Sequence, residues 1–221
     1  DIFVANGIYQ DLTNQDYLQY ISNEQVVKSI VSDKGVDYKK LVDLTGYERV
    51  LPMNSGAEAV ESAIKIARKW AYVVKGIPKY EAEIIVAAGN FHGRTVTIVS
   101  FSTEQFYKDA FGPFTPGFKV VTYGDIDEIK AAITPNTAAI LLEPIQGENG
   151  VVLPPDGYLK AVSELCKENN VLFIADEIQT GLCRTGKWFA CQHEDVHPVV
   201  TVIGKALSAG MYPVSAVLAS D

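Results

Sequence analysis

Short apolar runs recur along the chain and are separated by polar or helix-like segments. Each run is four to six residues long, which suits strands that are buried on both faces of a sheet. The runs of this kind are residues 84–88, 96–101, 118–122, 138–142, 171–175 and 200–203. Residues 214–219 form a further strand-like run. The pattern therefore predicts a sheet that contains several fully buried strands.

Helical spacing is clearest in residues 55–74, where apolar residues recur on one stripe. This segment opens with Ser55 and has Glu58 three residues later, which is the spacing of a capping box. Shorter helices are expected at residues 39–44, 125–133 and 156–169. Because strands and helices alternate, we expect an α/β fold whose central sheet is mostly parallel.

The composition and charge narrow the possible partners. The 221 residues are 48% hydrophobic and 21% charged, which suits one good hydrophobic core. The net charge of −8 repels phosphodiester backbones, so we expect no nucleic-acid partner. No apolar run approaches the ~20 residues that span a bilayer, so we expect no membrane partner. Cys166, Cys183 and Cys191 fit no metal-binding spacing and predict free thiols in a reducing compartment, the cytoplasm or the mitochondrial matrix.

Polar clusters follow several of the apolar runs, at the places where parallel sheets bind ligands. These clusters are residues 54–57, 90–95, 143–148, 176–179 and 204–205. In the first cluster, Gly56 lies at the opening turn of the long helix, where backbone N–H groups can bind an anion. A plain N-cap formed by Ser55 would explain the same residues.

Asp176 and Lys205 each follow a strand-like apolar run. A buried carboxylate requires a cationic or hydrogen-bonding partner, so a simple ion pair between the two is one interpretation. Catalysis is the other, since a lysine in such a place can form a Schiff base. With the anion site, these residues meet the needs of pyridoxal phosphate: N–H donors for its phosphate, a carboxylate for its pyridine nitrogen and an amine for its aldehyde.

A second motif points to a different chemistry. His193, Glu194 and His197 match the HExxH pattern, in which two imidazoles bind zinc and the glutamate acts as a base. Pro198 follows at once and disfavours helical geometry at His197. A zinc peptidase is therefore the weaker alternative, and we expect a turn before the strand at residues 200–203.

Five segments carry motifs of a known family, namely residues 53–59, 89–95, 143–150, 173–186 and 204–218. They resemble the class III (subgroup II) aminotransferases, which have fold type I of the pyridoxal phosphate enzymes. Three further segments resemble the ornithine-specific branch of that family, namely residues 68–72, 111–118 and 211–215.

The resemblance covers residues 47–221 and implies the cofactor-binding large domain of fold type I, with a mostly parallel sheet and helices on both faces. The family's C-terminal small domain is absent from this chain. Residues 1–46 resemble the family only in part and lack its loops after Ser22 and near Ser32. Because the chain starts inside an apolar stretch and stops after a strand-like run, we expect it to be part of a longer protein.

The resemblance implies a role for each residue around the cofactor ring. Lys205 would bind the cofactor aldehyde and later move a proton, and Asp176 would pair with the pyridine nitrogen. Gln179 would hydrogen-bond the phenolic oxygen, while Phe91 and Ile178 would pack on the two faces of the ring.

The resemblance also implies how the phosphate and the substrate are bound. The phosphate would be held by three residues of the first cluster, Ser55, Gly56 and Ala57. Arg94 would bind a substrate carboxylate through its bidentate geometry. Glu148 would act as a gate as the two substrates alternate. Glu143 belongs to the same substrate region, although a structural hydrogen-bond acceptor would explain it equally well.

The reaction implied by the resemblance moves the δ-amino group of L-ornithine to 2-oxoglutarate and gives glutamate 5-semialdehyde and glutamate. The partners would be small amino and 2-oxo acids, together with a second copy of the chain in a homodimer that shares its active site. Relatives that act on acetylornithine or γ-aminobutyrate are the nearest alternative. An inactive fold retained for association is another.

Overall fold

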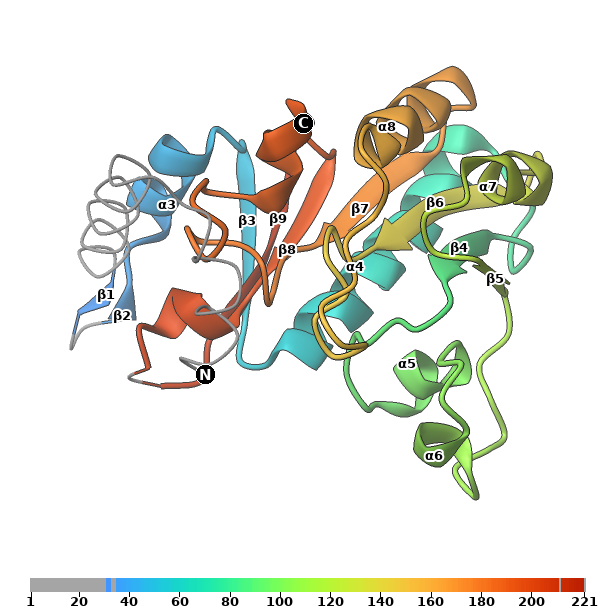
Figure 1. Ribbon diagram of the computed structural model, residues 1–221, viewed down its shortest axis with the longest axis horizontal. Coiled ribbons are helices and arrows are strands. Elements are labelled where there is room, and N and C mark those ends of the chain that lie inside the picture. Colours follow the sequence, from blue (N-terminus) through green and yellow to red (C-terminus); the bar gives the residue numbers. More distant parts are fainter. Residues whose placement is uncertain (1–30, 33–34, 211, 221) are drawn as a thin grey trace.

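The computed structural model describes residues 31–32, 35–210 and 212–220 (Figure 1). It begins with a small antiparallel pair, β1 (Val31–Ser32) and β2 (Gly35–Val36), followed by α3 (Tyr38–Thr45). The missing loop expected after Ser22 lies outside the described residues, and so do residues 33–34, which follow Ser32.

A seven-stranded sheet forms the centre of the molecule, in the order β3-β9-β8-β7-β6-β4-β5. Its strands are β3 (Arg49–Met53), β4 (Glu83–Ala87), β5 (Phe118–Val121), β6 (Thr137–Leu142), β7 (Leu172–Asp176), β8 (Val200–Ile203) and β9 (Ser215–Ala219). In sheet order, the strands β5, β4, β6, β7 and β8 pair in parallel. Only β9, of the strands in this sheet, runs antiparallel to both of its neighbours, β8 and β3. The prediction of a mostly parallel sheet is therefore confirmed.

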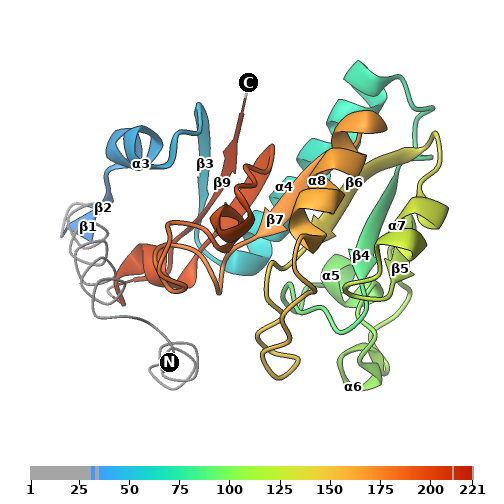
Figure 2. The same ribbon diagram turned by 45° about the horizontal axis from the view of Figure 1, so that its top comes forward.

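Helices connect the strands and cover the sheet (Figures 1 and 2). They are α4 (Gly56–Trp70), α5 (Val96–Ser100), α6 (Gln105–Lys108), α7 (Ile126–Ala132) and α8 (Tyr158–Glu168). A π-helical turn at Ala71–Lys75 extends α4, and short 3-10 turns occupy Ala190–Glu194 and Lys205–Ser208. None of the described helices is long and apolar enough to cross a membrane.

The two faces of the sheet carry separate cores, because successive strand residues point to opposite faces. On one face, alternate residues such as Ile84, Val86 and Ile174 are fully buried against α4 and α5. On the other face, Ile85 and Phe173 pack with side chains of α7 and α8, which lie side by side in Figure 2. The strands therefore have no polar face, which is why they are uninterrupted apolar runs in the sequence.

The run at residues 96–101 was expected to be a strand, and this expectation is wrong. Thr95 caps a helix there, because its side-chain oxygen accepts the N–H of Ile98 at 3.4 Å. Ile98 and Val99 are buried, whereas Val96 is 56% exposed, so the run buries one side of a helix instead of two faces of a strand. The β-branched residues suit a strand, but packing against α4 decides the structure.

The chain reverses its course across the sheet at β4, which pairs with β5 on one side and with β6 on the other. It leaves β4 through α5, on the face of α4, and it leaves β6 through α8, on the opposite face. The loops that follow β4 and β6 therefore diverge. In open α/β sheets, ligands bind in the crevice formed at such a point.

Candidate active site

A cavity of about 190 Å³ lies at this crevice. Its lining consists of Gly56, Ala57, Phe91, His92, Gly93, Glu143, Asp176, Ile178, Gln179 and Lys205. The structure thus brings together eight of the eleven predicted site residues, from loops after β4, β6 and β7, the end of β7, the turn after β8 and the start of α4. Ser55, Arg94 and Glu148 are the three that do not line it.

The start of α4 forms one wall of the cavity. The predicted capping box is present, since the hydroxyl of Ser55 accepts the N–H of Glu58 at 3.2 Å and the Glu58 carboxylate accepts the N–H of Ser55 at 2.7 Å. Gly56 follows, and a Cβ there would lie 2.9 Å from Cδ1 of Ile178. Glycine therefore lets Ile178 lie directly over the first turn. The N–H groups of Gly56 and Ala57 have no acceptor within the helix and are available to an anion.

Asp176, the last residue of β7, lies deep in the cavity wall and is 5% exposed. One carboxylate oxygen accepts the N–H of Ile178 at 3.1 Å, and the other lies 2.6 Å from Nδ1 of His92. Burial opposes a charge on His92, but its hydrogen bond to Asp176 and the charges of Asp176 and Glu143 raise its pKa above the ordinary value. The contact with Asp176 therefore favours the imidazolium form of His92.

His92 is a site residue that the sequence reasoning missed. Its imidazole is fully buried, and its Nε2 atom has no hydrogen-bond partner. The cluster at residues 90–95 was noted, yet nothing in it shows that this histidine would contact an aspartate 84 positions later.

Glu143 follows β6 and is also buried. Burial raises its pKa to about 7, the charge of Asp176 adds to this effect, and the charge of His92 and the N–H of Phe91 oppose it. One of its oxygens accepts the N–H of Phe91 at 2.8 Å. Glu143 thus fixes the backbone of the loop after β4, as the structural interpretation of this residue expected, while it also lines the cavity.

Lys205 comes directly after Gly204, at the end of β8, and has a positive φ of 35°. Strained backbone of this kind is common at functional sites. Its amine donates a hydrogen bond to Oε1 of Gln179 and lies 3.7 Å from a carboxylate oxygen of Glu148. The amine is thus held by Gln179 and Glu148, whereas Asp176 is held by His92, so the simple ion pair between Lys205 and Asp176 is not the observed arrangement.

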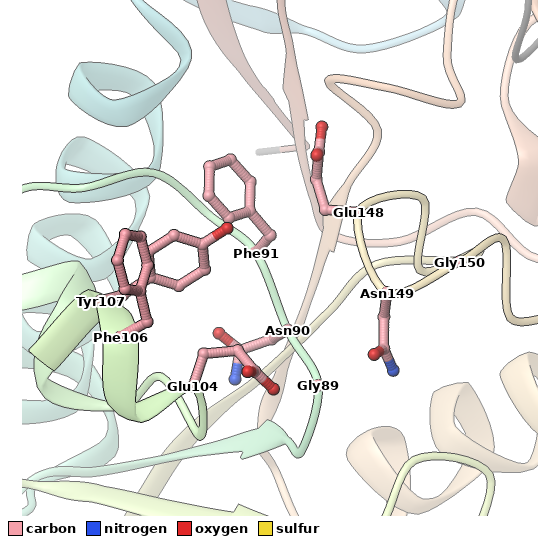
Figure 3. Close-up of a pocket in the computed structure, with 9 residues that line it drawn as sticks. All are labelled: Gly89, Asn90, Phe91, Glu104, Phe106, Tyr107, Glu148, Asn149 and Gly150. Carbon is pink, nitrogen blue, oxygen red and sulfur yellow. The ribbon is translucent and has the colours of Figure 1, made fainter.

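A second hollow of about 360 Å³ adjoins the cavity and shares Phe91 with it (Figure 3). Glu148 lines this second hollow together with Phe91 and Tyr107, and Figure 3 shows their side chains. Arg94 lines a third hollow of about 700 Å³, on the side of α5 and α6. Of the three predicted substrate residues, Arg94 and Glu148 therefore lie in hollows beside the cavity, and Glu143 lines the cavity itself.

Glu177 is a buried acid that the sequence reasoning did not use. Its carboxylate accepts the N–H groups of Ala190 and Cys191 at 3.0 and 2.9 Å and the hydroxyl of Thr180. Burial raises its pKa. Glu177 therefore ties both ends of the loop that begins with Ile178.

The residues of the HExxH motif separate in the structure. His193 contacts the carbonyl of Thr185 at 2.9 Å through Nε2, and the ring of His197 packs on that of Tyr47 at 4.4 Å. Glu194 accepts the backbone N–H of Lys160 at 2.9 Å. Among the described residues, no group of three histidine, cysteine or acidic side chains could hold a metal ion. The geometry does not favour the zinc peptidase alternative.

The family model for class-III aminotransferases matches residues 21–221. The chain belongs to the class III aminotransferases. An Exiguobacterium sp. protein named ornithine aminotransferase is 64% identical over 184 residues, which are 83% of this chain and 46% of that protein. This class III chain spans about half the length of the curated relatives that it matches.

Solved structures show the same family and fold. The ornithine aminotransferase from Toxoplasma gondii, whose structure has partial occupancy of PLP at its active site, matches with a TM-score of 0.82 and 53% identity, over 83% of this chain and 43% of that chain. The acetylornithine aminotransferase from Elizabethkingia anophelis matches with a TM-score of 0.70 and 45% identity, over 91% and 49% of the two chains. The predicted resemblance and the fold type I architecture of this class III chain are confirmed.

Proposed function

We propose that residues 47–221 form the cofactor-binding large domain of a longer pyridoxal phosphate enzyme. This enzyme transfers the δ-amino group of L-ornithine to 2-oxoglutarate and gives glutamate 5-semialdehyde and glutamate. The observation that carries the proposal is that Lys205 and Asp176 line one cavity at the start of α4. The names of the relatives, mostly ornithine aminotransferases, support the choice of substrate.

The residues of the cavity fit pyridoxal phosphate. Gly56 leaves room where a Cβ would meet Ile178, so the phosphate can approach the N–H groups of Gly56 and Ala57 beside Ser55. Phe91 and Ile178 would cover the faces of the ring, and Gln179 would contact its phenolic oxygen. When bound, the cofactor supplies an electron sink for the negative charge that develops on the substrate carbon.

The chain's own groups would hold and move the protons of this reaction. Asp176, positioned by its contact with His92, would hold a proton on the pyridine nitrogen. The amine of Lys205 would bind the aldehyde and then carry a proton to and from the substrate carbon. Gln179 and Glu148 orient this amine before substrate arrives.

Substrate recognition would depend on the residues around the cavity. Arg94 would bind a substrate carboxylate, and Glu148 would act as the gate as the two substrates alternate. Glu143 would belong to the same substrate region, beside the cofactor. The similarity to an acetylornithine aminotransferase keeps that substrate as the second candidate. A higher kcat/KM for acetylornithine than for ornithine in the full-length enzyme would establish the second candidate in place of the first.

The proposal also includes the setting of the enzyme. A homodimer is supported by large apolar side chains exposed beside the site, such as Phe106 and Phe111, which are 87% and 60% exposed. A cytoplasmic location is supported by three free, buried cysteines.

The decisive test is Lys205→Ala in the full-length enzyme. We expect the visible absorption band of the lysine-bound cofactor to disappear and turnover to fall by at least about a thousandfold, because nucleophile and proton carrier are lost together. Lys160→Ala is the matched control, since Lys160 is exposed on α8 and its hydrogen bond to Glu194 is formed by its backbone N–H, which alanine keeps. If Lys205→Ala shows the same absorption band and the same turnover as the Lys160→Ala control, the proposal is wrong.

A further inference from the structure

The guanidinium of Arg94 lies against two neighbouring aromatic rings. Its central carbon is 5.5 Å from the ring centroid of Phe91 and 5.5 Å from that of Tyr107. The two rings contact each other edge to face, with centroids 5.6 Å apart, and Figure 3 shows them side by side. Both distances are within the range of cation–π attraction, which orients a guanidinium. One of these rings, Phe91, also lines the cavity that contains Lys205.

The position of Tyr107 is fixed relative to the loop that carries Phe91 and Arg94. The N–H of Gly89 donates to the hydroxyl of Thr103 at 2.9 Å, and the side-chain amide of Asn90 donates to the carbonyl of Phe101 at 3.2 Å. These bonds connect the loop after β4 to the segment that leads into α6. Tyr107, on α6, is therefore held beside Arg94 by the fold.

Arg94 keeps its hydrogen-bonding edge available. Among the described residues, no carboxylate forms an ion pair with it, although Asp109 lines the same hollow. Aromatic rings interact with a guanidinium without using up all of its N–H donors. An arginine held in this way can still bind a carboxylate with two parallel hydrogen bonds.

We propose that Tyr107 is a positioning residue, which holds Arg94 against Phe91 and thereby sets the affinity of the enzyme for the carboxylate of its amino donor. The inference rests on the proposed role of Arg94. Tyr107 acts through Arg94 and not on the reacting atoms, so its replacement changes KM and leaves kcat nearly unchanged.

The test compares Tyr107→Leu with Tyr107→Phe in the full-length holoenzyme. Tyr107→Leu removes the ring, so we expect KM for ornithine to rise about two- to fivefold, the change that corresponds to one cation–π contact. Tyr107→Phe keeps the ring and should restore the parent KM. Tyr80→Leu is the matched control, because Tyr80 is 92% exposed and contacts Tyr72 instead.

Two further measurements separate positioning from a general structural role. The inhibition constant of 1,4-diaminobutane, which is ornithine without its carboxylate, should be the same in Tyr107→Leu and the parent. In an Arg94→Gln background, Tyr107→Leu should have no additional effect on KM. The inference would be overturned if Tyr107→Leu raised the inhibition constant of 1,4-diaminobutane as much as it raises KM for ornithine. It would also be overturned if Tyr107→Leu raised KM as much in the Arg94→Gln background as in the parent.

The failure of the proposed function would look different. If Arg94→Gln leaves KM for ornithine unchanged, Arg94 does not bind the carboxylate, and both the role of Arg94 and that of Tyr107 are wrong. If Arg94→Gln raises KM while Tyr107→Leu does not, only the positioning role of Tyr107 is wrong.

Discussion

Replacing His92 with phenylalanine should destabilise the cofactor-free protein by about 3 kcal/mol. The imidazole is fully buried and lies 2.6 Å from the carboxylate of Asp176, which is itself 5% exposed. Breaking a buried charged pair costs about 3–5 kcal/mol, because the remaining charge is left without its partner. The lower end applies here, since Asp176 retains the N–H of Ile178 at 3.1 Å.

The pH dependence of this loss is a sharper test than its size. The hydrogen bond to Asp176 raises the pKa of His92 in the folded protein despite its burial, so the folded state binds the proton more tightly than the unfolded state. The stabilisation is therefore complete below the unfolded pKa of about 6.5 and is lost as the pH rises through the higher folded pKa. The free-energy difference between parent and His92→Phe should shrink accordingly.

Urea unfolding of the cofactor-free protein at pH 6 and pH 9 measures both effects. His92→Asn keeps a neutral donor near the position of Nδ1, so it should lose less stability than His92→Phe. Its difference from the parent should vary with pH in the same way, because both variants lack the titrating imidazole. His197→Phe is the matched control, because His197 is exposed and keeps its ring contact with Tyr47. Equal losses in the His92 and His197 variants, or a loss that does not vary with pH, would refute the reasoning.

Two other predictions concern acids of the site. Glu143→Gln should gain stability relative to the parent as the pH rises from about 4.5 to about 7, by up to about 3 kcal/mol, because burial raises the pKa of Glu143 to about 7 and the parent must then bury a charge. Urea unfolding at pH 5 and pH 8 measures this, and a difference that is the same at both values would contradict it. Glu148→Ala, which removes the carboxylate 3.7 Å from the Lys205 amine, should weaken the discrimination between ornithine and glutamate several-fold in single-turnover kinetics of the two half-reactions. The same rate change in both half-reactions would count against the gate role of Glu148.

Local sequence signals predicted the parts of the site that depend on short-range geometry. The capping box of Ser55 and Glu58 is complete within four residues, so its pattern is sufficient to place the start of α4. Asp176 and Lys205 follow apolar runs directly, and the carboxyl ends of parallel strands meet at one edge of the sheet. The same rule brought Glu143 and Gln179 to the cavity.

Contacts between distant segments were not predictable in this way. The apolar run at residues 96–101 has strand-like composition, and only its packing on α4 makes it a helix. His92 depends on Asp176, which is 84 positions away. The sequence also has two successive acids at the end of β7, and only strand geometry decides that Asp176 lines the cavity while Glu177 turns away from it toward Ala190.

The buried carboxylate of Glu177 should make one loop of the site as resistant to local unfolding as the core of the sheet. It closes the loop containing Ile178 and Gln179 by accepting the amides of Ala190 and Cys191. Opening this loop alone would leave the buried carboxylate of Glu177 without its hydrogen bonds. We therefore expect these amides to exchange with solvent only when the β7–β8 region unfolds. Local opening of the site would therefore fall to segments outside this loop, such as the one that carries Phe106 and Phe111, whose side chains are largely exposed.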